Sequence, residues 1–207
     1  MAGGWELLAS ETTDANTGSG ATIDTGTIAA AKFLKVAVYS VGGANHRIAL
    51  RFNGDGANTD KYAVTHTFGW QPSGNTSNGT NESLVSQDEI LCMGYASGDS
   101  QSTIIQIFNP SQGEKLCWIQ SLDDEVGNPS AYQGVGKYAD NTQITSIQVV
   151  NKGSSNMASG TTITVWGADD AGNQSPNPNL PNGAIFEESD TGKHYMFDGS
   201  QTWNEVT

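Results

Sequence analysis

Short runs of β-branched, aromatic and other apolar residues recur along this chain at intervals of roughly 8–15 residues, separated by clusters of Gly, Asn, Ser and Asp. Such runs are typical of β-strands, and the clusters between them are typical of turns. Helix-forming runs of Ala, Leu, Glu and Lys are missing, whereas the chain has 25 glycines. The sequence therefore predicts an all-β protein. The clearest strands are expected at residues 33–41, 46–52, 62–68, 90–95, 103–108, 115–120, 144–150 and 161–166.

Two of these runs, ITSIQVV at residues 144–150 and TTITVW at residues 161–166, alternate apolar with polar residues. This period of two is expected of a strand that has one face in a core and the other in solvent. About eight such strands joined by long polar loops predict a two-sheet antiparallel sandwich that is jelly-roll-like. We expect this domain to span residues 1–167, with surface loops at residues 11–26 and 71–86.

The composition changes after the last of these strands. Residues 168–181, ADDAGNQSPNPNLP, contain three of the six prolines of the chain and almost no residue to bury, which predicts a linker. Strand-like character then returns in residues 182–207, which predict a short C-terminal β meander. Its three strands are expected at residues 184–188, 194–198 and 202–206.

A meander of about 25 residues is too small to be stable alone, so we expect it to dock on another surface. The partner surface could belong to the main domain, to a neighbouring copy or to another protein. Large apolar side chains are the expected contacts. The predicted docking residues are Phe186, Tyr195, Phe197 and Trp203.

Charge narrows the range of partners. The chain has 9 Lys and Arg against 22 Asp and Glu, a formal net charge of −13. A negative field of this size repels phosphates and anionic lipids, so we expect neither nucleic acid nor membrane as a partner. The first residues lack the pattern of a secretion signal, and no apolar run is long enough to span a bilayer, which predicts synthesis in a cytoplasm. The two cysteines, Cys92 and Cys117, lie in apolar runs and are expected to be buried free thiols.

No catalytic pattern stands out. The three histidines, His46, His66 and His194, lie in separate strand-like runs, outside any HExxH, GxSxG or Cys-His arrangement. The adjacent carboxylates of Asp123 and Asp124 point to opposite faces of a strand and so do not form an acid–base pair. The sequence therefore predicts a protein that is not an enzyme, although carboxylates from distant strands could still form a glycosidase site.

The segment RFNGDGANTDKY at residues 51–62 has two interpretations. Its oxygen-bearing side chains are dense enough to bind calcium, which takes six to eight oxygen ligands. Their spacing departs from the EF-hand pattern, and the same residue types build ordinary β-turns. We expect a turn and no cofactor, with calcium as the alternative. The candidate ligands are Asn53, Asp55, Asn58 and Asp60.

The five tryptophans raise the question of sugar stacking. Trp118 and Trp166 lie inside apolar runs, which predicts that they belong to the core. Trp70 lies at a strand end beside Gly69 and is the candidate for contact with a glycan.

Four Asn residues begin N-x-Ser/Thr sequons that matter only in a host that glycosylates proteins. They are Asn75, Asn78, Asn81 and Asn173.

Several phrases of the sequence resemble a family of β-rich virion proteins from tailed bacteriophages and related marine or archaeal viruses. They are GWELLAS near the start, FLKVAVYS followed by HRIALRFNGDGANTDKY, and ITSIQVVNKGSSNMASGTTITVWG. The tail LPNGAIFEESDTGKHYMFDGSQTWNEV is similar to a short C-terminal module of phage structural proteins. The long 71–86 segment has no counterpart in the pattern, and no catalytic residue comes with it.

The resemblance implies a structural protein on the outside of a virus particle, as a capsid decoration, a head fibre or a tail-associated subunit. It implies association with copies of itself, as a trimer, and with other virion proteins such as the major capsid protein or the tail. An alternative hypothesis is a carbohydrate-binding adhesin, in which Trp70 and the neighbouring loop contact host surface glycans. A glycan-cleaving enzyme is disfavoured because no motif supports it.

Overall fold

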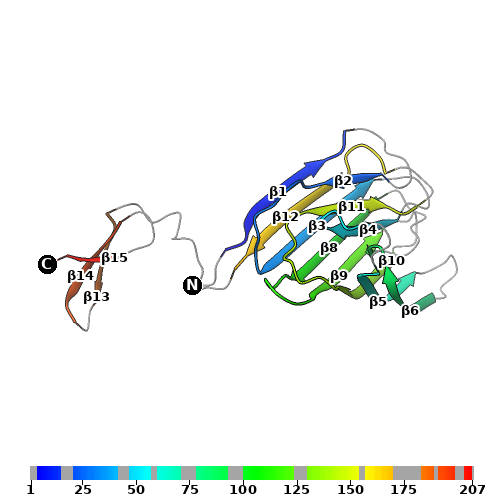
Figure 1. Cartoon of the computed structure of the whole chain (residues 1–207). Helices are drawn as coiled ribbons and strands as arrows, with labels where there is room; N and C mark the ends of the chain where they lie inside the picture. Colours follow the sequence, from blue (N-terminus) through cyan, green and yellow to red (C-terminus); the bar gives the residue numbers. More distant parts are fainter. Residues whose placement is uncertain are drawn as a thin grey trace. The chain divides into compact units, whose positions relative to one another are not determined.

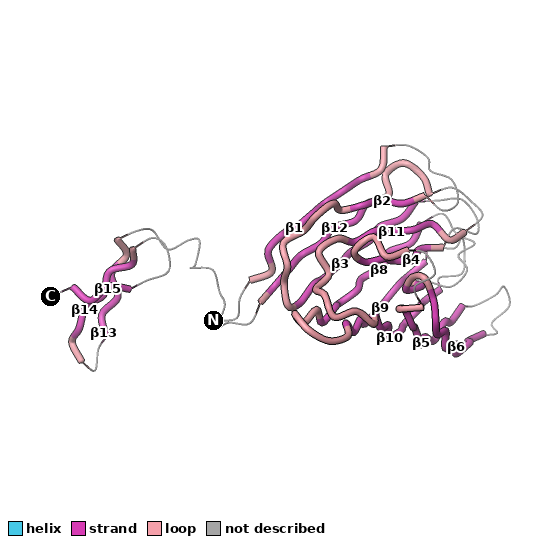
Figure 2. Tube along the Cα trace, viewed as in Figure 1, coloured by secondary structure: helices cyan, strands magenta, loops and turns pink. Residues whose placement is uncertain are grey.

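The computed structural model describes residues 4–14, 21–41, 47–56, 60–70, 78–92, 100–123, 130–153, 157–169, 183–188, 191–198 and 203–206. These residues contain β-strands, turns and loops and no helix, so the predicted all-β class is confirmed (Figure 2). No helix in this described part of the chain is long and apolar enough to cross a membrane.

Eight antiparallel strands form a large sheet. In order across the sheet they are β1 (Glu6–Thr12), β12 (Thr162–Ala168), β3 (Phe33–Val41), β8 (Ser100–Phe108), β9 (Lys115–Asp123), β10 (Ser130–Tyr138), β5 (Tyr62–Trp70) and β6 (Asn78–Gln87). A second antiparallel sheet has four strands. They are β2 (Thr22–Asp24), β11 (Ile147–Asn151), β4 (Ile48–Phe52) and β7 (Ile90–Leu91).

The small sheet lies over the large one, and the core fills the space between them (Figure 1). The predicted two-sheet antiparallel sandwich is therefore confirmed. Its strand order is compatible with a jelly roll, but the sheets have eight and four strands rather than four each, and the jelly-roll topology stays a prediction. The buried aliphatic residues of this core include Leu34, Val36, Ile105, Ile119 and Val165 from the large sheet and Ile48, Leu50, Ile147 and Val149 from the small one.

Aromatic residues close one end of the core. The rings of Tyr62 and Tyr138 stack with their centroids 4.8 Å apart, and Phe52 packs edge-on against Tyr138 at 5.4 Å. The Tyr62 hydroxyl accepts a hydrogen bond from the Phe52 backbone N–H at 2.9 Å. Since all three residues are buried, this bond satisfies a backbone group that no solvent could reach.

Two asparagines hold the segment that precedes β11. Asn109 donates to the Ala31 and Ile144 carbonyls at 2.9 and 3.2 Å and accepts from the Ile144 N–H at 2.8 Å. Asn53 donates to the Gln143 carbonyl at 3.0 Å and accepts from the Thr145 N–H at 2.8 Å. These side chains replace strand neighbours as hydrogen-bond partners, which explains why β11 begins at Ile147 and not at residue 144 as predicted.

The sequence analysis was wrong about two loops. Residues 78–86 of the predicted 71–86 loop belong to the edge strand β6, and Thr22–Asp24 of the predicted 11–26 loop form β2. An edge strand such as β6 has a partner on one side only, and its polar residues Asn81, Glu82 and Ser83 are exposed to solvent at little cost. Its composition therefore resembled that of a loop.

The chain divides into two compact units, one of them Gly4–Ala168. The other contains Asp169–Thr207 and includes a three-stranded antiparallel sheet. Its strands are β13 (Ile185–Glu188), β14 (Lys193–Phe197) and β15 (Trp203–Val206), close to the predicted meander strands. Of the predicted linker, Ala168 is the last residue of β12, and residues 170–181 lie outside the described part.

Candidate binding face

Alternation along the inner strands of the large sheet separates a buried face from an exposed one. In β9 the odd-numbered residues from Lys115 to Asp123 are buried against the small sheet, and the even-numbered residues from Leu116 to Leu122 are exposed. β8 and β10 alternate in the same way. The small sheet packs on the buried face, and among the described residues of the sandwich no element covers the other face.

We call this exposed side of the large sheet the open face. Its residues are Thr162, Thr164, Trp166 and Ala168 of β12; Phe33, Lys35, Ala37 and Tyr39 of β3; Ser102, Ile104, Gln106 and Phe108 of β8; Leu116, Trp118, Gln120 and Leu122 of β9; Ala131, Gln133, Val135 and Lys137 of β10; and Ala63, Thr65 and Thr67 of β5.

The register aligns these residues in rows across the sheet. Trp118 lies opposite Gln106 on one side and opposite Val135 on the other. In the next row Phe108 lies between Phe33 and Leu116. The rings of Phe33 and Phe108 are in contact, with their centroids 5.6 Å apart. Aromatic and aliphatic side chains from four consecutive strands thus form one continuous surface.

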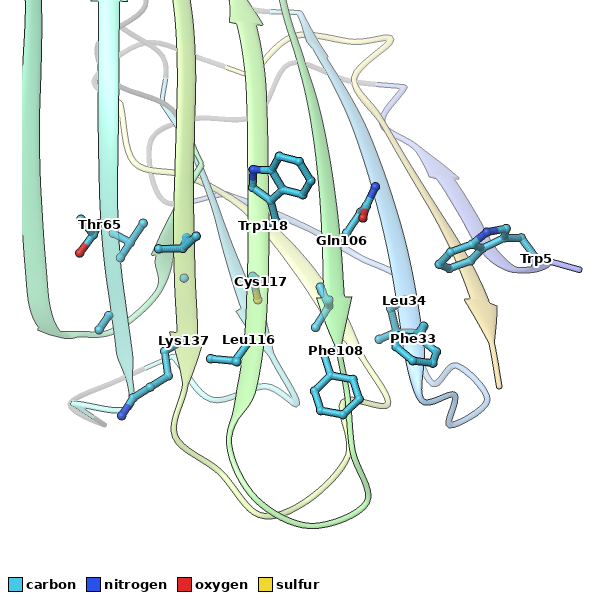
Figure 3. A pocket seen from close by; sticks show the side chains of 15 residues that line it. Trp5, Phe33, Leu34, Thr65, Gln106, Phe108, Leu116, Cys117, Trp118 and Lys137 are labelled. Carbon is cyan, nitrogen blue, oxygen red and sulfur yellow. The ribbon is translucent and has the colours of Figure 1, made fainter. Parts of the chain in front are cut away.

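Part of the open face is hollowed. A depression of about 680 Å³ is bordered by Trp5, Phe33, Phe108, Leu116 and Trp118, among others. Figure 3 shows the Trp118 indole beside Gln106, with Phe108 and Leu116 further along their strands. The buried Leu34 and Cys117 form part of its floor. The lining is mainly apolar, so the depression favours an apolar group or the flat face of a ring.

Acidic residues are missing from the open face. None of the 23 positions that define it is Asp or Glu, although the whole chain has 22 such residues. Its charged residues are two lysines. The Lys137 ammonium pairs with Glu114 at 2.8 Å, and the Lys35 ammonium lies 5.8 Å from the centre of the Trp166 ring. The strongly negative field of this protein therefore arises from other surfaces.

The open face also presents amide groups. Gln106, Gln120 and Gln133 are exposed on three consecutive strands, β8, β9 and β10. Each amide can both donate and accept hydrogen bonds. Toward β6, Thr65 bonds to Ser83 at 2.9 Å and Thr67 donates to Asn81 at 2.7 Å. The polar part of the face can therefore bind either another amide surface or the hydroxyls of a sugar.

The prediction that Trp118 and Trp166 belong to the core is wrong. Trp118 is exposed and Trp166 is half-buried on the open face. Both alternating sets of KLCWIQ contain apolar residues, so periodicity could not decide which set faces the core. Trp70, the predicted glycan contact, is the last residue of β5 and pairs with Asn78; its side chain lies outside the described part of the structure.

The candidate calcium segment includes a positively charged side chain of its own, that of Lys61. The Lys61 ammonium lies between two carboxylates, 2.6 Å from Asp55 and 2.9 Å from Asp140. Asn53 is used for the hydrogen bonds described above, Asp60 is exposed, and Asn58 lies outside the described residues. No group of three or more His, Cys, Asp or Glu suited to a metal occurs in the described part of the chain. Lys61 thus supplies at this place the positive charge that calcium would bring.

We expect the protein to stay folded without calcium, because Lys61 already forms ion pairs with both Asp55 and Asp140. Adding EDTA in excess should change the melting temperature of the full chain by less than about 1 °C, as for a protein whose native state binds no metal. Differential scanning fluorimetry with and without EDTA makes the measurement. A fall in melting temperature that added calcium restores would contradict this expectation.

Asp140 makes the stability depend on acid pH. Hydrogen bonds from the backbone N–H and the hydroxyl of Thr142, and then from Lys61, hold the pKa of Asp140 well below its ordinary value of 3.8. A carboxylate whose pKa is lowered by folding contributes stability above its unfolded pKa, and this contribution is lost as the pH falls. Stability should therefore decrease below about pH 4.

The test is to compare Asp140→Asn with the parent chain in urea unfolding from pH 7 to pH 2. The variant should be less stable at pH 7 and should lose less stability on acidification. Glu11→Gln, at an exposed position of β1, is the control for removing one carboxylate. An equally steep loss in Asp140→Asn would show that other groups set the acid dependence.

The described histidines and cysteines lie in different local environments. His66 is buried, stacks on Tyr132 with ring centroids 4.5 Å apart, and has a pKa lowered by that burial. His194 is exposed on β14 with Nε2 3.8 Å from Glu187 Oε2, and His46 lies outside the described residues. Cys92 and Cys117 are buried free thiols, as expected.

Comparisons with protein-family models, with curated proteins and with solved structures found no match to this chain.

The predicted docking residues meet in the C-terminal sheet. Phe186 pairs with Tyr195 in the register, with ring centroids 6.5 Å apart, and Phe197 pairs with Trp203. Phe197 is buried and Phe186 is exposed. An ion pair between Lys193 and Glu205, 3.0 Å apart, joins β14 to β15. This small unit therefore has an aromatic cluster that is partly open to solvent.

Proposed function

We propose that this chain is a non-enzymatic structural subunit on the exterior of a virus particle, and that the open face is the surface through which it associates with its partners. The observation that supports association is the combination of exposed large apolar side chains and missing carboxylates on one side of a sheet. Isolated soluble proteins rarely leave contiguous apolar patches of that extent uncovered. The resemblance of the sequence to virion proteins supports the proposed location on a virus particle.

In this proposal the protein is made in the cytoplasm of the infected host and is then added to the particle, on the capsid or on the tail. Its partners are copies of itself and other virion proteins. No step requires a cofactor, a nucleic acid or a membrane. The rigid sandwich supplies a fixed surface, and the small C-terminal sheet supplies a second, separate apolar cluster.

Immunogold labelling of purified virus particles with antibodies against the recombinant chain tests whether the protein lies on the particle exterior. Gold on the particle exterior, lost when the antibodies are preincubated with free protein, is the expected result. Recovery of the protein only from the soluble fraction of infected cells, with no label on particles, would contradict the proposal.

A carbohydrate-binding adhesin is a second candidate function, and a specific feature favours it. The exposed Trp118 indole lies among the amides of Gln106, Gln120 and Gln133, and an aromatic ring flanked by hydrogen-bonding groups is a suitable surface for a sugar. A glycan array with the parent chain and Trp118→Ala separates this function from the first. Binding that the substitution abolishes supports it, and absence of any binding rejects it.

A further inference from the structure

We propose that the partner of the open face is the open face of a second copy of this chain. The inference rests on the proposed function, because it names the partner of the same surface. The exposed apolar side chains, the area of the face, its charge and its self-complementarity each support it.

The first argument is the extent of exposure. Leu116 is 56% exposed, Trp118 53%, Leu122 64% and Val135 60%. Trp118 and Val135 lie opposite each other, Leu116 is the neighbouring exposed residue of β9, and Leu122 follows beyond Gln120. Side chains of this size, adjacent and half or more exposed, are the kind that form the centre of an interface and dominate its binding energy.

The second argument is area. Five strands of nine residues and one of seven, spaced by about 4.8 Å with about 3.3 Å per residue, cover roughly 800 Å². A stable protein–protein interface buries about 800 Å² on each partner. The open face is thus large enough for a complete interface, whereas a short glycan would leave most of its apolar side chains exposed.

The third argument is charge. Each copy carries a formal net charge of −13, so two copies repel each other least when they meet where acidic residues are missing. The open face meets this condition. Lys137 is already paired with Glu114 of its own chain, which lowers the cost of bringing two such faces together.

The fourth argument is self-complementarity. In a twofold interface the same surface meets itself, so its groups must find their partners among the groups of that same surface. The amides of Gln106, Gln120 and Gln133 can do so, because each has both donors and acceptors. Apolar side chains can also pack against their own kind. A face of unpaired lysines or carboxylates could not.

The first experiment measures the mass of the full chain by light scattering and sedimentation velocity over a range of concentrations. We expect association in the parent chain and a dissociation constant raised on the order of 100-fold in Trp118→Glu, as for a central interface residue. Trp118 is exposed in the single chain, so the substitution leaves the core intact; circular dichroism checks this. Asn141→Glu, at an exposed turn outside the open face, is the matched control and should associate like the parent.

The second experiment tests the face-to-face arrangement. Ile104, Gln120 and Gln133 form one row across the middle of the open face, and each is replaced by cysteine in turn. A short bis-maleimide should then join two copies for at least one of the three variants. The native thiols should not react, because both are buried and burial raises the pKa of Cys117 to about 12. Asn141→Cys is the control and should not be cross-linked.

A chain that remains monomeric, whether or not it binds glycans, overturns the inference. So does an assembly, trimeric or other, in which none of the three cysteines is cross-linked. These results are independent of the particle labelling. If the antibodies label particles but the isolated chain is monomeric, only the proposal that a second copy binds the open face is rejected. If the chain self-associates but particles are not labelled, only the proposed location on a virus particle is rejected.

Discussion

Asn109→Ala should lower the free energy of unfolding by about 4 kcal/mol, because it leaves three buried backbone groups without partners, each costing about 1–3 kcal/mol. Those groups are the carbonyls of Ala31 and Ile144 and the N–H of Ile144. Asn109 itself is fully buried, so water does not replace the lost bonds. The side chain also ties together three segments that are distant in the sequence.

Urea unfolding followed by tryptophan fluorescence measures this loss. Asn141→Ala, in the exposed turn, is the control and should change stability by less than about 0.5 kcal/mol, as surface substitutions usually do. A loss below about 1 kcal/mol in Asn109→Ala would show that the surrounding segments rearrange and find other partners.

Deleting residues 182–207 should leave the sandwich folded and abolish attachment through the C-terminal sheet. The core cluster is built from residues 23–165, so the deletion removes none of it. The sheet that is lost exposes Ile185 at 70% and Phe186 at 53%, which are the side chains expected at a docking contact. We expect an unchanged melting temperature for residues 1–181 and a loss of binding to virus particles or to sister copies.

Thermal melting and cosedimentation with purified particles measure the two effects on the truncated and full chains. Trp203→Ala in the full chain is the companion variant and should cost on the order of 3 kcal/mol in whichever contact buries this ring. If residues 1–181 unfold, the C-terminal sheet belongs to the main core. If they bind particles like the full chain, this sheet is not an attachment device.

The sequence predicted the class of the fold because most core strands have a marked pattern. Residues 33–41 were predicted as a strand with the bounds that β3 has in the structure. β10 was not among the predicted strands; its sequence SAYQGVGKY contains two glycines, which are more typical of turns than of strands. In the structure a Cβ on Gly134 would lie 3.0 Å from His66, and one on Gly136 would lie 3.1 Å from Ile90. These glycines allow close packing, which depends on neighbours that are distant in the sequence.

The candidate binding face could be predicted only in part. The exposed side of β9 depends on which alternating set meets the small sheet, and the buried set begins with Lys115. A buried lysine is contrary to what composition predicts. It is accommodated because its ammonium donates to the carbonyls of Gly113 and Asp140 at 2.6 and 3.0 Å. Hydrophobicity alone would have placed Leu116 and Trp118 in the core.

The first and last strands of the sandwich pair with each other, and this pairing makes the domain suitable for insertion into other proteins. Glu6 of β1 lies opposite Gly167 of β12, so the chain enters and leaves the domain through adjacent residues, about 5 Å apart in an antiparallel pair. A domain with adjacent ends can be inserted into a loop of another protein without spreading that loop. The sandwich can therefore be transferred by recombination as one folded unit, and other segments can be fused to either of its ends.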